Sequence, residues 1–170
     1  MRIALYPGSF NPIHEGHLDV LEQTHKIFDK VLLVLATNPE KEGLRQETLA
    51  KRLAYIRSKI EPFGNLDVTY TNGLLSDFVE DLKKENNDYD IQAVIRGLRN
   101  TKDFEDEKTL KYLYQDTGLW VPVIHVISSR TVTHVSSSAI RALDKIYKKP
   151  KTQEEAEKRI RNWASLNKKE

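Results

Sequence analysis

Two histidines stand near the start of the chain, in a segment rich in glycine and proline. It reads Tyr6-Pro7-Gly8-Ser9-Phe10-Asn11-Pro12-Ile13-His14-Glu15-Gly16-His17, and a helical pattern of apolar residues begins at Leu18. Glycine lets a backbone approach a bulky anion closely. The start of a helix offers that anion unpaired N–H groups and a partial positive charge. The segment therefore predicts a phosphate site, where His17 is neutral and donates a hydrogen bond to a phosphate oxygen.

The spacing of the two histidines excludes several other sites. The segment is neither a Walker A sequence nor a GxGxxG fingerprint, and the histidines lack the HExxH spacing of a helical zinc site. One alternative stays open, in which His14 and His17 only cap a helix. The surrounding prolines and glycines favour the phosphate site over this alternative.

Two arginines form a second cluster, in the run Arg96-Gly97-Leu98-Arg99 at the end of an apolar stretch. A guanidinium stays charged and binds phosphate oxygens in a bidentate manner, so this run suits a polyanion.

An acidic run follows the arginines. Asp103 and Glu107 are one helical turn apart, and we expect them to orient an arginine or to help hold a metal. For Glu105 and Asp106 we expect a surface ion-pair network with the arginines.

A third group consists of hydroxyls at the start of a later helix. Ser136, Ser137 and Ser138 could form a second anion cradle with the backbone N–H groups there. Serine runs commonly just cap helices, so this signal is weak alone. Lys41 follows the second apolar run and is either a solvated loop charge or a contact to a substrate phosphate.

The elements that position these clusters follow from apolar periodicity. Strands are predicted at residues 3–6, 31–36, 66–70, 91–95 and 121–127, and helices between them at 18–28, 49–60, 74–82 and 103–116. This alternation predicts the α/β class, as a doubly wound, Rossmann-like, five-stranded parallel sheet of order 3-2-1-4-5. Strands one and four are then neighbours, so the histidine and arginine clusters meet at their carboxyl ends.

The C-terminal part is predicted to be helical. Ser136 could cap a helix that ends before Pro150. In the tail, Thr152 and Glu155 have capping-box spacing and precede an amphipathic pattern. We therefore expect one domain over residues 1–150 and, over 151–170, a helix that packs on that domain. An oligomer contact or a lid is the alternative role of this helix.

Composition narrows the classes of partner. The chain has 170 residues, 39% of them hydrophobic and 31% charged, which is typical of one globular domain. A net charge of +2 is too small for a broad nucleic-acid surface, and no apolar stretch is long enough to cross a membrane. The chain has no cysteine, which fits a cytoplasmic protein. A small, anionic partner is expected.

Taken together, residues 1–143 resemble the HxGH nucleotidyltransferases and, among them, the bacterial-type phosphopantetheine adenylyltransferases. Arg96-Gly97-Leu98-Arg99 with Asp103-Phe104-Glu105 and Glu107 carries most of this resemblance. It implies transfer of AMP from Mg²⁺-bound ATP to 4′-phosphopantetheine, with dephospho-coenzyme A and pyrophosphate as products. It also implies a homo-oligomer, often a hexamer.

The resemblance also implies roles for individual residues. The catalytic residues would be His17, Arg99 and Lys41. The ATP site would be formed by Ser9, Phe10, His14, His17, Gly97, Arg99, Glu107, Ser136, Ser137 and Ser138. The acceptor site would be formed by Ser9, Lys41, Leu74, Leu75 and Arg96. No residue is assigned as a metal ligand, because Mg²⁺ would arrive with ATP.

Two alternatives remain open. His14 and the run from Ser138 to Arg141 are closer to the nicotinamide mononucleotide adenylyltransferases, which would change the acceptor but not the chemistry. The second alternative is a noncatalytic nucleotide sensor, against which the presence of both His17 and Arg99 argues.

Overall fold

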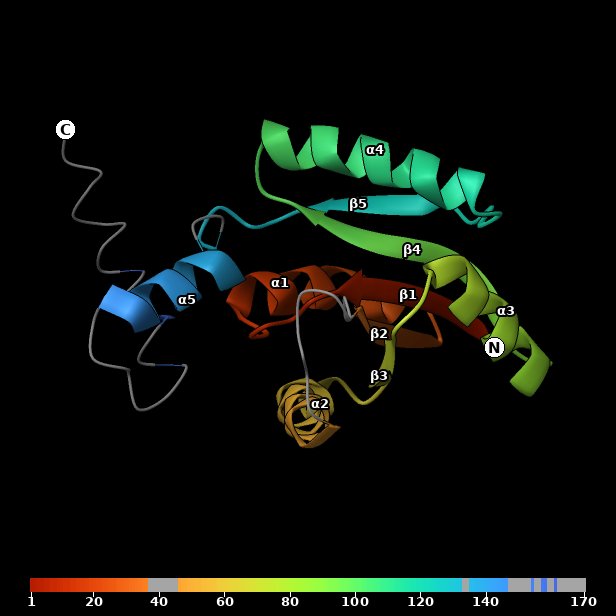
Figure 1. Ribbon diagram of the computed structural model, residues 1–170, viewed down its shortest axis with the longest axis horizontal. Coiled ribbons are helices and arrows are strands. Elements are labelled where there is room, and N and C mark those ends of the chain that lie inside the picture. Colours follow the sequence, from red (N-terminus) through yellow and green to blue (C-terminus); the bar gives the residue numbers. More distant parts are fainter. Residues whose placement is uncertain (37–45, 133–134, 147–153, 155–156, 159–160, 162–170) are drawn as a thin grey trace.

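The protein is described from a computed structural model, which covers residues 1–36, 46–132, 135–146, 154, 157–158 and 161. Five strands form one sheet (Figure 1): β1 (Arg2–Gly8), β2 (Lys30–Ala36), β3 (Leu66–Thr71), β4 (Asp90–Leu98) and β5 (Val123–Ile127). Every pair of neighbours is parallel, and the order is β3-β2-β1-β4-β5. The predicted fold class and strand order are confirmed.

Helices cover both faces of the sheet, as crossover connections in a doubly wound sheet require. They are α1 (Glu15–Thr24), α2 (Gln46–Ile60), α3 (Leu75–Glu85), α4 (Thr101–Asp116) and α5 (Ser137–Ile146), with 3₁₀ turns at His25–Ile27 and Glu61–Phe63. In Figure 1, α4 and α2 lie on opposite sides of the strands. Apolar side chains of α1 and α2 pack on one face of the sheet, and those of α3 and α4 on the other.

The central strand owes its position to a continuous apolar run. Ile3, Ala4 and Leu5 are fully buried, because β1 lies between β2 and β4 and both its faces are covered. Successive residues of β1 therefore serve the two core layers alternately. The histidine segment follows β1 and therefore lies at the carboxyl edge of the sheet.

Most predicted boundaries differ from the structure by one to four residues, and two of these differences have a clear local cause. Helix α1 begins at Glu15, not at Leu18, because His14 supplies a side-chain cap that apolar periodicity does not reveal. Strand β5 begins at Val123, two residues later than predicted. Pro122 precedes it and has no N–H for the ladder, although its carbonyl accepts a bond from the N–H of Val94 (2.8 Å).

The predicted cap of α5 is confirmed. The Ser136 hydroxyl accepts a hydrogen bond from the N–H of Ala139 (3.1 Å), and its carbonyl accepts one from Ile140 (3.0 Å). The proposed domain boundary at 150 lies outside the described residues. Of the tail, the four described residues are helical, and Arg161 forms an ion pair with Glu15 of α1. None of the described helices is both long enough and apolar enough to cross a bilayer.

Candidate active site

The loops that follow β1, β4 and β5 enclose a cavity of about 390 Å³ at the carboxyl edge of the sheet. All the residues predicted for the ATP site line it: Ser9, Phe10, His14, His17, Gly97, Arg99, Glu107, Ser136, Ser137 and Ser138. Segments more than a hundred residues apart thus meet around one space. Nucleotide binding by these residues stays a prediction.

The two histidines cap α1 and line the cavity at the same time. Nδ1 of His14 accepts the N–H of Gly16 (3.1 Å), and Nδ1 of His17 accepts the N–H of His14 (3.2 Å). The two rings stack, with centroids 3.8 Å apart. The capping and phosphate-binding interpretations therefore do not exclude one another. Because both Nδ1 atoms accept, each neutral ring carries its proton on Nε2, which becomes a donor.

Burial and nearby cations keep both rings neutral. Burial, together with the charge of Arg99, lowers the pKa of His14 to about 4. The pKa of His17 is held well below its usual value by burial, and further by His14 and the two arginines. A neutral His17 is what a hydrogen-bond donor beside a phosphate requires, as opposed to an acid that releases its proton near neutral pH.

Two helices, α2 and α5, hold the loop between β1 and α1 through three hydrogen bonds. Arg52 of α2 donates to the carbonyl of Ser9 (2.7 Å). The hydroxyl of Ser137 donates to the carbonyl of Pro12 (3.0 Å), and Arg141 donates to that of Asn11 (2.5 Å). The start of α5 is thereby tied to the loop, so the serines face the histidines across the cavity.

Gly8 is required by the ring that follows it. Phe10 is 2% exposed and has a left-handed φ of 42°. Its ring lies so close that a Cβ at position 8 would be 3.0 Å from it. The same ring is edge-on to His17, with centroids 5.0 Å apart. Glycine at position 8 therefore lets Phe10 support His17.

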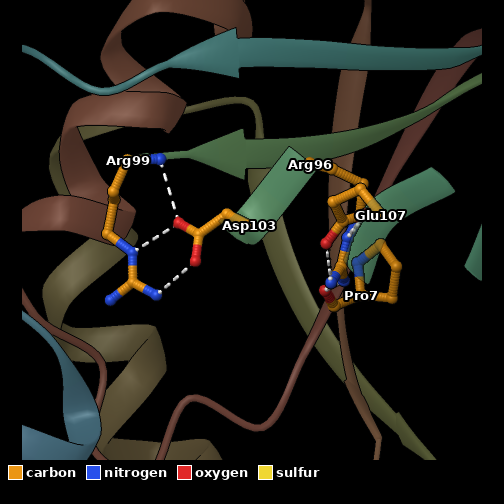
Figure 2. Close-up of polar contacts among 5 residues, drawn as sticks. All are labelled: Pro7, Arg96, Arg99, Asp103 and Glu107. Carbon is orange, nitrogen blue, oxygen red and sulfur yellow. Dashed lines mark hydrogen bonds and ion pairs between the residues drawn. The ribbon is translucent and has the colours of Figure 1, made fainter. Parts of the chain in front are cut away.

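Each arginine of the second cluster is held by a carboxylate of α4 (Figure 2). Arg96 donates to both oxygens of Glu107 (2.7 and 2.5 Å) and to the carbonyl of Pro7 (2.7 Å). Arg99 donates Nε and Nη2 to Asp103 (2.9 and 3.1 Å), and its backbone N–H binds the same carboxylate (3.0 Å). Asp103 and Glu107 thus orient the arginines, one of the two roles predicted for them.

These ion pairs leave donors for a ligand. A guanidinium has five N–H groups, and on Arg99 both Nη1 hydrogens lie outside the contacts with Asp103. Partial burial raises the pKa of Asp103, but the hydrogen bonds from Arg99 outweigh this and lower it overall. The carboxylate stays charged at neutral pH and keeps the guanidinium in place.

Glu105 was predicted to form ion pairs with the arginines, and this prediction is wrong. Glu105 binds Lys108 (3.2 Å) and not an arginine, because the arginines approach α4 on the side that carries Asp103 and Glu107. Asp106, expected in the same network, lines the cavity. Among the described residues, no group of three or more His, Asp or Glu side chains could by itself hold a metal ion.

Gly97 allows α1 to pack closely on β4. A Cβ at this position would lie 2.9 Å from Cγ2 of Val20, which is almost fully buried. The missing side chain brings the histidine helix against the arginine strand. The two clusters therefore face one cavity.

A second cavity, of about 370 Å³, adjoins the first. The two share Pro7, Gly8, Ser9 and Arg96 in their linings. The remaining walls are mostly apolar, and they include Leu74, Leu75, Leu110, Leu113 and Tyr114. Four of the residues predicted for the acceptor site, Ser9, Leu74, Leu75 and Arg96, thus line it. The fifth, Lys41, lies outside the described residues.

Several residues of the site are not apparent from the sequence alone. Tyr6 and Ser128 line the first cavity, but Tyr6 belongs to an apolar strand run and Ser128 is one of several polar residues after β5. Asp19 accepts hydrogen bonds from the hydroxyl and the N–H of Ser129, the latter at 2.8 Å, and so ties the loop after β5 to α1. Their position is the one feature that could have identified Tyr6 and Ser128, because each lies near the carboxyl end of a strand.

This fold and this site define a nucleotidyltransferase, and comparisons with known proteins agree. A family model described as cytidylyltransferase-like matches residues 5–143. The phosphopantetheine adenylyltransferases of Carboxydothermus hydrogenoformans and Clostridium perfringens (strain 13 / Type A) are each 36% identical over 141 residues. These cover 83% of this chain and 82% and 80% of the two relatives, respectively. The chain therefore belongs to the cytidylyltransferase-like family and is related within it to the phosphopantetheine adenylyltransferases.

A solved structure supports the fold. It is assigned as a nicotinate-nucleotide adenylyltransferase from Vibrio parahaemolyticus and matches with a TM-score of 0.56 at 18% identity. The match covers 85% of this chain and 81% of that one. At this identity the likeness concerns the architecture alone. The family match ends at residue 143, so the C-terminal tail lies beyond it.

Proposed function

We propose that this protein transfers the adenylyl group of ATP to 4′-phosphopantetheine, giving dephospho-coenzyme A and pyrophosphate. The observation that carries the proposal is the pair of adjoining cavities. One is lined by histidines, arginines and serines and suits a triphosphate, and the other is lined by leucines and suits an apolar arm. Their shared wall at Ser9 and Arg96 is where an acceptor phosphate would meet the α-phosphate.

The reaction needs no nucleophile from the protein. An oxygen of the acceptor phosphate attacks the α-phosphorus of ATP in line, the bond to the bridging oxygen breaks, and pyrophosphate leaves. Holding both reactants in this geometry can supply about 7 to 11 kcal/mol. A preorganised donor at the developing charge adds about 3 to 4 kcal/mol. His17, with its Nε2 proton, is that donor in our proposal.

The two arginines are proposed to bind different substrates. Arg99, with Nη1 outside its pair with Asp103, binds the ATP phosphates. Arg96 lines both cavities, which supports the proposal that it binds the pantetheine side of the acceptor. Ser9 and Lys41 are proposed to contact the acceptor phosphate.

Mg²⁺ is proposed to enter with ATP. This ion commonly keeps several waters and is held by substrate phosphates plus one or two carboxylates. The described residues fit that pattern: Asp103 and Glu107 are committed to arginines, while Asp106 lines the cavity without an ion pair among the described residues. When bound, the ion would neutralise phosphate charge.

The acceptor decides between this proposal and its alternative, nicotinamide mononucleotide. In favour of the alternative, His14 stacks on His17 and Arg141 binds Ser138 (3.0 Å), so both residues of that resemblance belong to the site. A pyrophosphate-release assay with ATP and each acceptor separately tests the choice. We expect release with phosphopantetheine; release with the mononucleotide alone would overturn the proposal, and none with any acceptor would indicate a nucleotide sensor.

The leucine-lined cavity can be tested separately. Leu74 is 48% exposed, so Leu74→Asp should leave the fold intact. We expect this variant to raise KM for phosphopantetheine and to leave KM for ATP unchanged, because a carboxylate disfavours an apolar arm. The control is Tyr112→Asp, because Tyr112 is exposed on α4. Leu82→Asp is not suitable, because Leu82 packs in the core.

We further propose that the protein acts in the cytoplasm and forms a homo-oligomer. The family resemblance suggests that this oligomer is a hexamer. Trp120, three residues before the edge strand β5, is 75% exposed, and Ile127, the last residue of that strand, is 76% exposed. Large apolar side chains at a sheet edge are suited to a contact with a second copy. Light scattering on the wild type and on Trp120→Ala measures the mass, and a monomeric wild type would contradict the proposal.

A further inference from the structure

Tyr6 lies on the wall of the charged cavity and has no role in the proposed reaction so far. It is the fifth residue of β1, and it is 5% exposed. Its ring is edge-on to Phe10, with centroids 5.3 Å apart, and to His17, with centroids 6.4 Å apart. The side chain therefore packs against the proposed catalytic histidine.

The hydroxyl of Tyr6 has no hydrogen-bond partner among the described residues, although the side chain is more than nine-tenths buried. It is close to Gly97, where a Cβ would lie 3.7 Å from it. The oxygen itself is not among the fully buried side-chain atoms that lack a partner, so it reaches the surface of the cavity that Tyr6 lines. A hydroxyl at that surface has a hydrogen bond to offer to whatever fills the cavity.

The surroundings of the hydroxyl indicate what it binds. Burial raises the pKa of Tyr6, and Glu107 adds to this, while Arg96 and Arg99 work in the opposite direction. The phenol therefore keeps its proton and is a donor throughout the working pH range. Both arginines and His17, which line the same cavity, are donors too, so the space they share suits an anion with several oxygens.

We propose that Tyr6 is a nucleotide-binding residue, whose hydroxyl donates a hydrogen bond to a phosphate oxygen of ATP beside His17 and Arg99. This inference rests on the proposed adenylyl transfer and adds a neutral donor to its charged ones. The donor comes from strand β1, whereas His17 comes from the first turn of α1.

The substitution Tyr6→Phe removes the hydroxyl and keeps the ring against Phe10 and His17. We expect kcat/KM for ATP to fall about 10- to 100-fold, the usual effect of losing one hydrogen bond to a charged group. The melting temperature of the free protein should not fall, because no contact within the described protein is lost. The rise in melting temperature that ATP produces should shrink.

Tyr89→Phe is the matched control. Tyr89 is half-buried in the apolar layer next to α3 and lies outside both cavities. We expect it to leave kcat/KM and the effect of ATP on melting unchanged. An equal loss in both variants would show a general effect of removing tyrosine hydroxyls, and would overturn the proposal.

Two further outcomes would also overturn it. One is a Tyr6→Phe variant with wild-type kcat/KM and a wild-type response to ATP. The other is a lower melting temperature of the free variant with unchanged kinetics, which would make the hydroxyl structural. The melting experiment needs ATP alone, so it still tests Tyr6 if no acceptor yields pyrophosphate and the proposed function fails.

Discussion

His17 is the residue on which the proposed chemistry depends most. Its Nδ1 is occupied by the backbone N–H of His14, so its orientation and its Nε2 proton are both set before a ligand arrives. Preorganisation of this kind is effective because nothing has to move as charge develops. The loop is thus shaped by the same hydrogen bonds that prepare the donor.

We predict that His17→Ala lowers kcat about 100- to 1000-fold, the typical effect of removing one preorganised donor. The fold should persist, because His14 can still cap α1 through Gly16. Steady-state kinetics together with circular dichroism make the measurement. Near-wild-type turnover would remove His17 from the mechanism.

The neutral histidines also predict how stability depends on pH. Below about pH 6.5 the unfolded chain protonates His14, whereas the folded protein does so only near its pKa of about 4. The unfolded state then binds more protons, so stability falls as the pH drops between these two values. For His14 alone, the full loss is about 3 kcal/mol.

Urea unfolding at about pH 7.5 and about pH 5 measures this loss. His14→Asn is the informative variant, since asparagine keeps a side-chain acceptor for the N–H of Gly16 and cannot titrate. We expect the variant to lose less stability than the wild type on acidification. Equal losses in both proteins would contradict a neutral, buried His14.

At the scale of elements, the site depends on how closely α1 approaches β4. That approach is possible because Gly97 has no side chain to meet Val20. A helix and a strand that touch at this point bring the histidine and arginine clusters to one cavity. The geometry of the active site therefore depends on the distance between α1 and β4.

We predict that Gly97→Ala lowers the free energy of unfolding by about 1 to 3 kcal/mol, as overpacking of a core does. It should also lower kcat/KM, because α1 must shift. A double-mutant cycle with Val20→Ala tests the cause. The two changes should be less than additive, since the smaller side chain makes room for the new methyl group, and strict additivity would place the strain elsewhere.

The sequence predicted the elements well where the signal was local. Apolar runs located all five strands, and their alternation with helices gave the strand order, because parallel crossovers allow few arrangements. The start of α1 was missed, since the cap is a histidine and not one of the common capping residues. Tyr6 was missed because one strand residue in an apolar run looks like another until its surroundings are known.

At the scale of the whole molecule, the C-terminal tail is the part that the family match does not include. Glu157 is buried, and Arg161 pairs with Glu15 in the first turn of α1. These contacts favour a tail that packs beside the histidine helix. Helix α1, which Arg161 contacts, packs on the opposite face of the sheet from α3.

We predict that a short bismaleimide reagent cross-links the two cysteines of the double variant Glu15→Cys/Arg161→Cys. The chain has no cysteine of its own, so only the introduced pair can react. Electrophoretic mobility measures the cross-link. Asp81→Cys with Arg161→Cys, which pairs the tail with α3, should give none; equal yields from both pairs would show that the tail does not rest on α1.

The wall that the two cavities share has a consequence for inhibitor chemistry. Pro7, Gly8, Ser9 and Arg96 border both spaces, so a compound that covalently tethers an adenosine polyphosphate to a lipophilic chain could occupy them together. Once one half is seated, the other is held at a high effective concentration. Such a bisubstrate compound should bind more tightly than either of its halves.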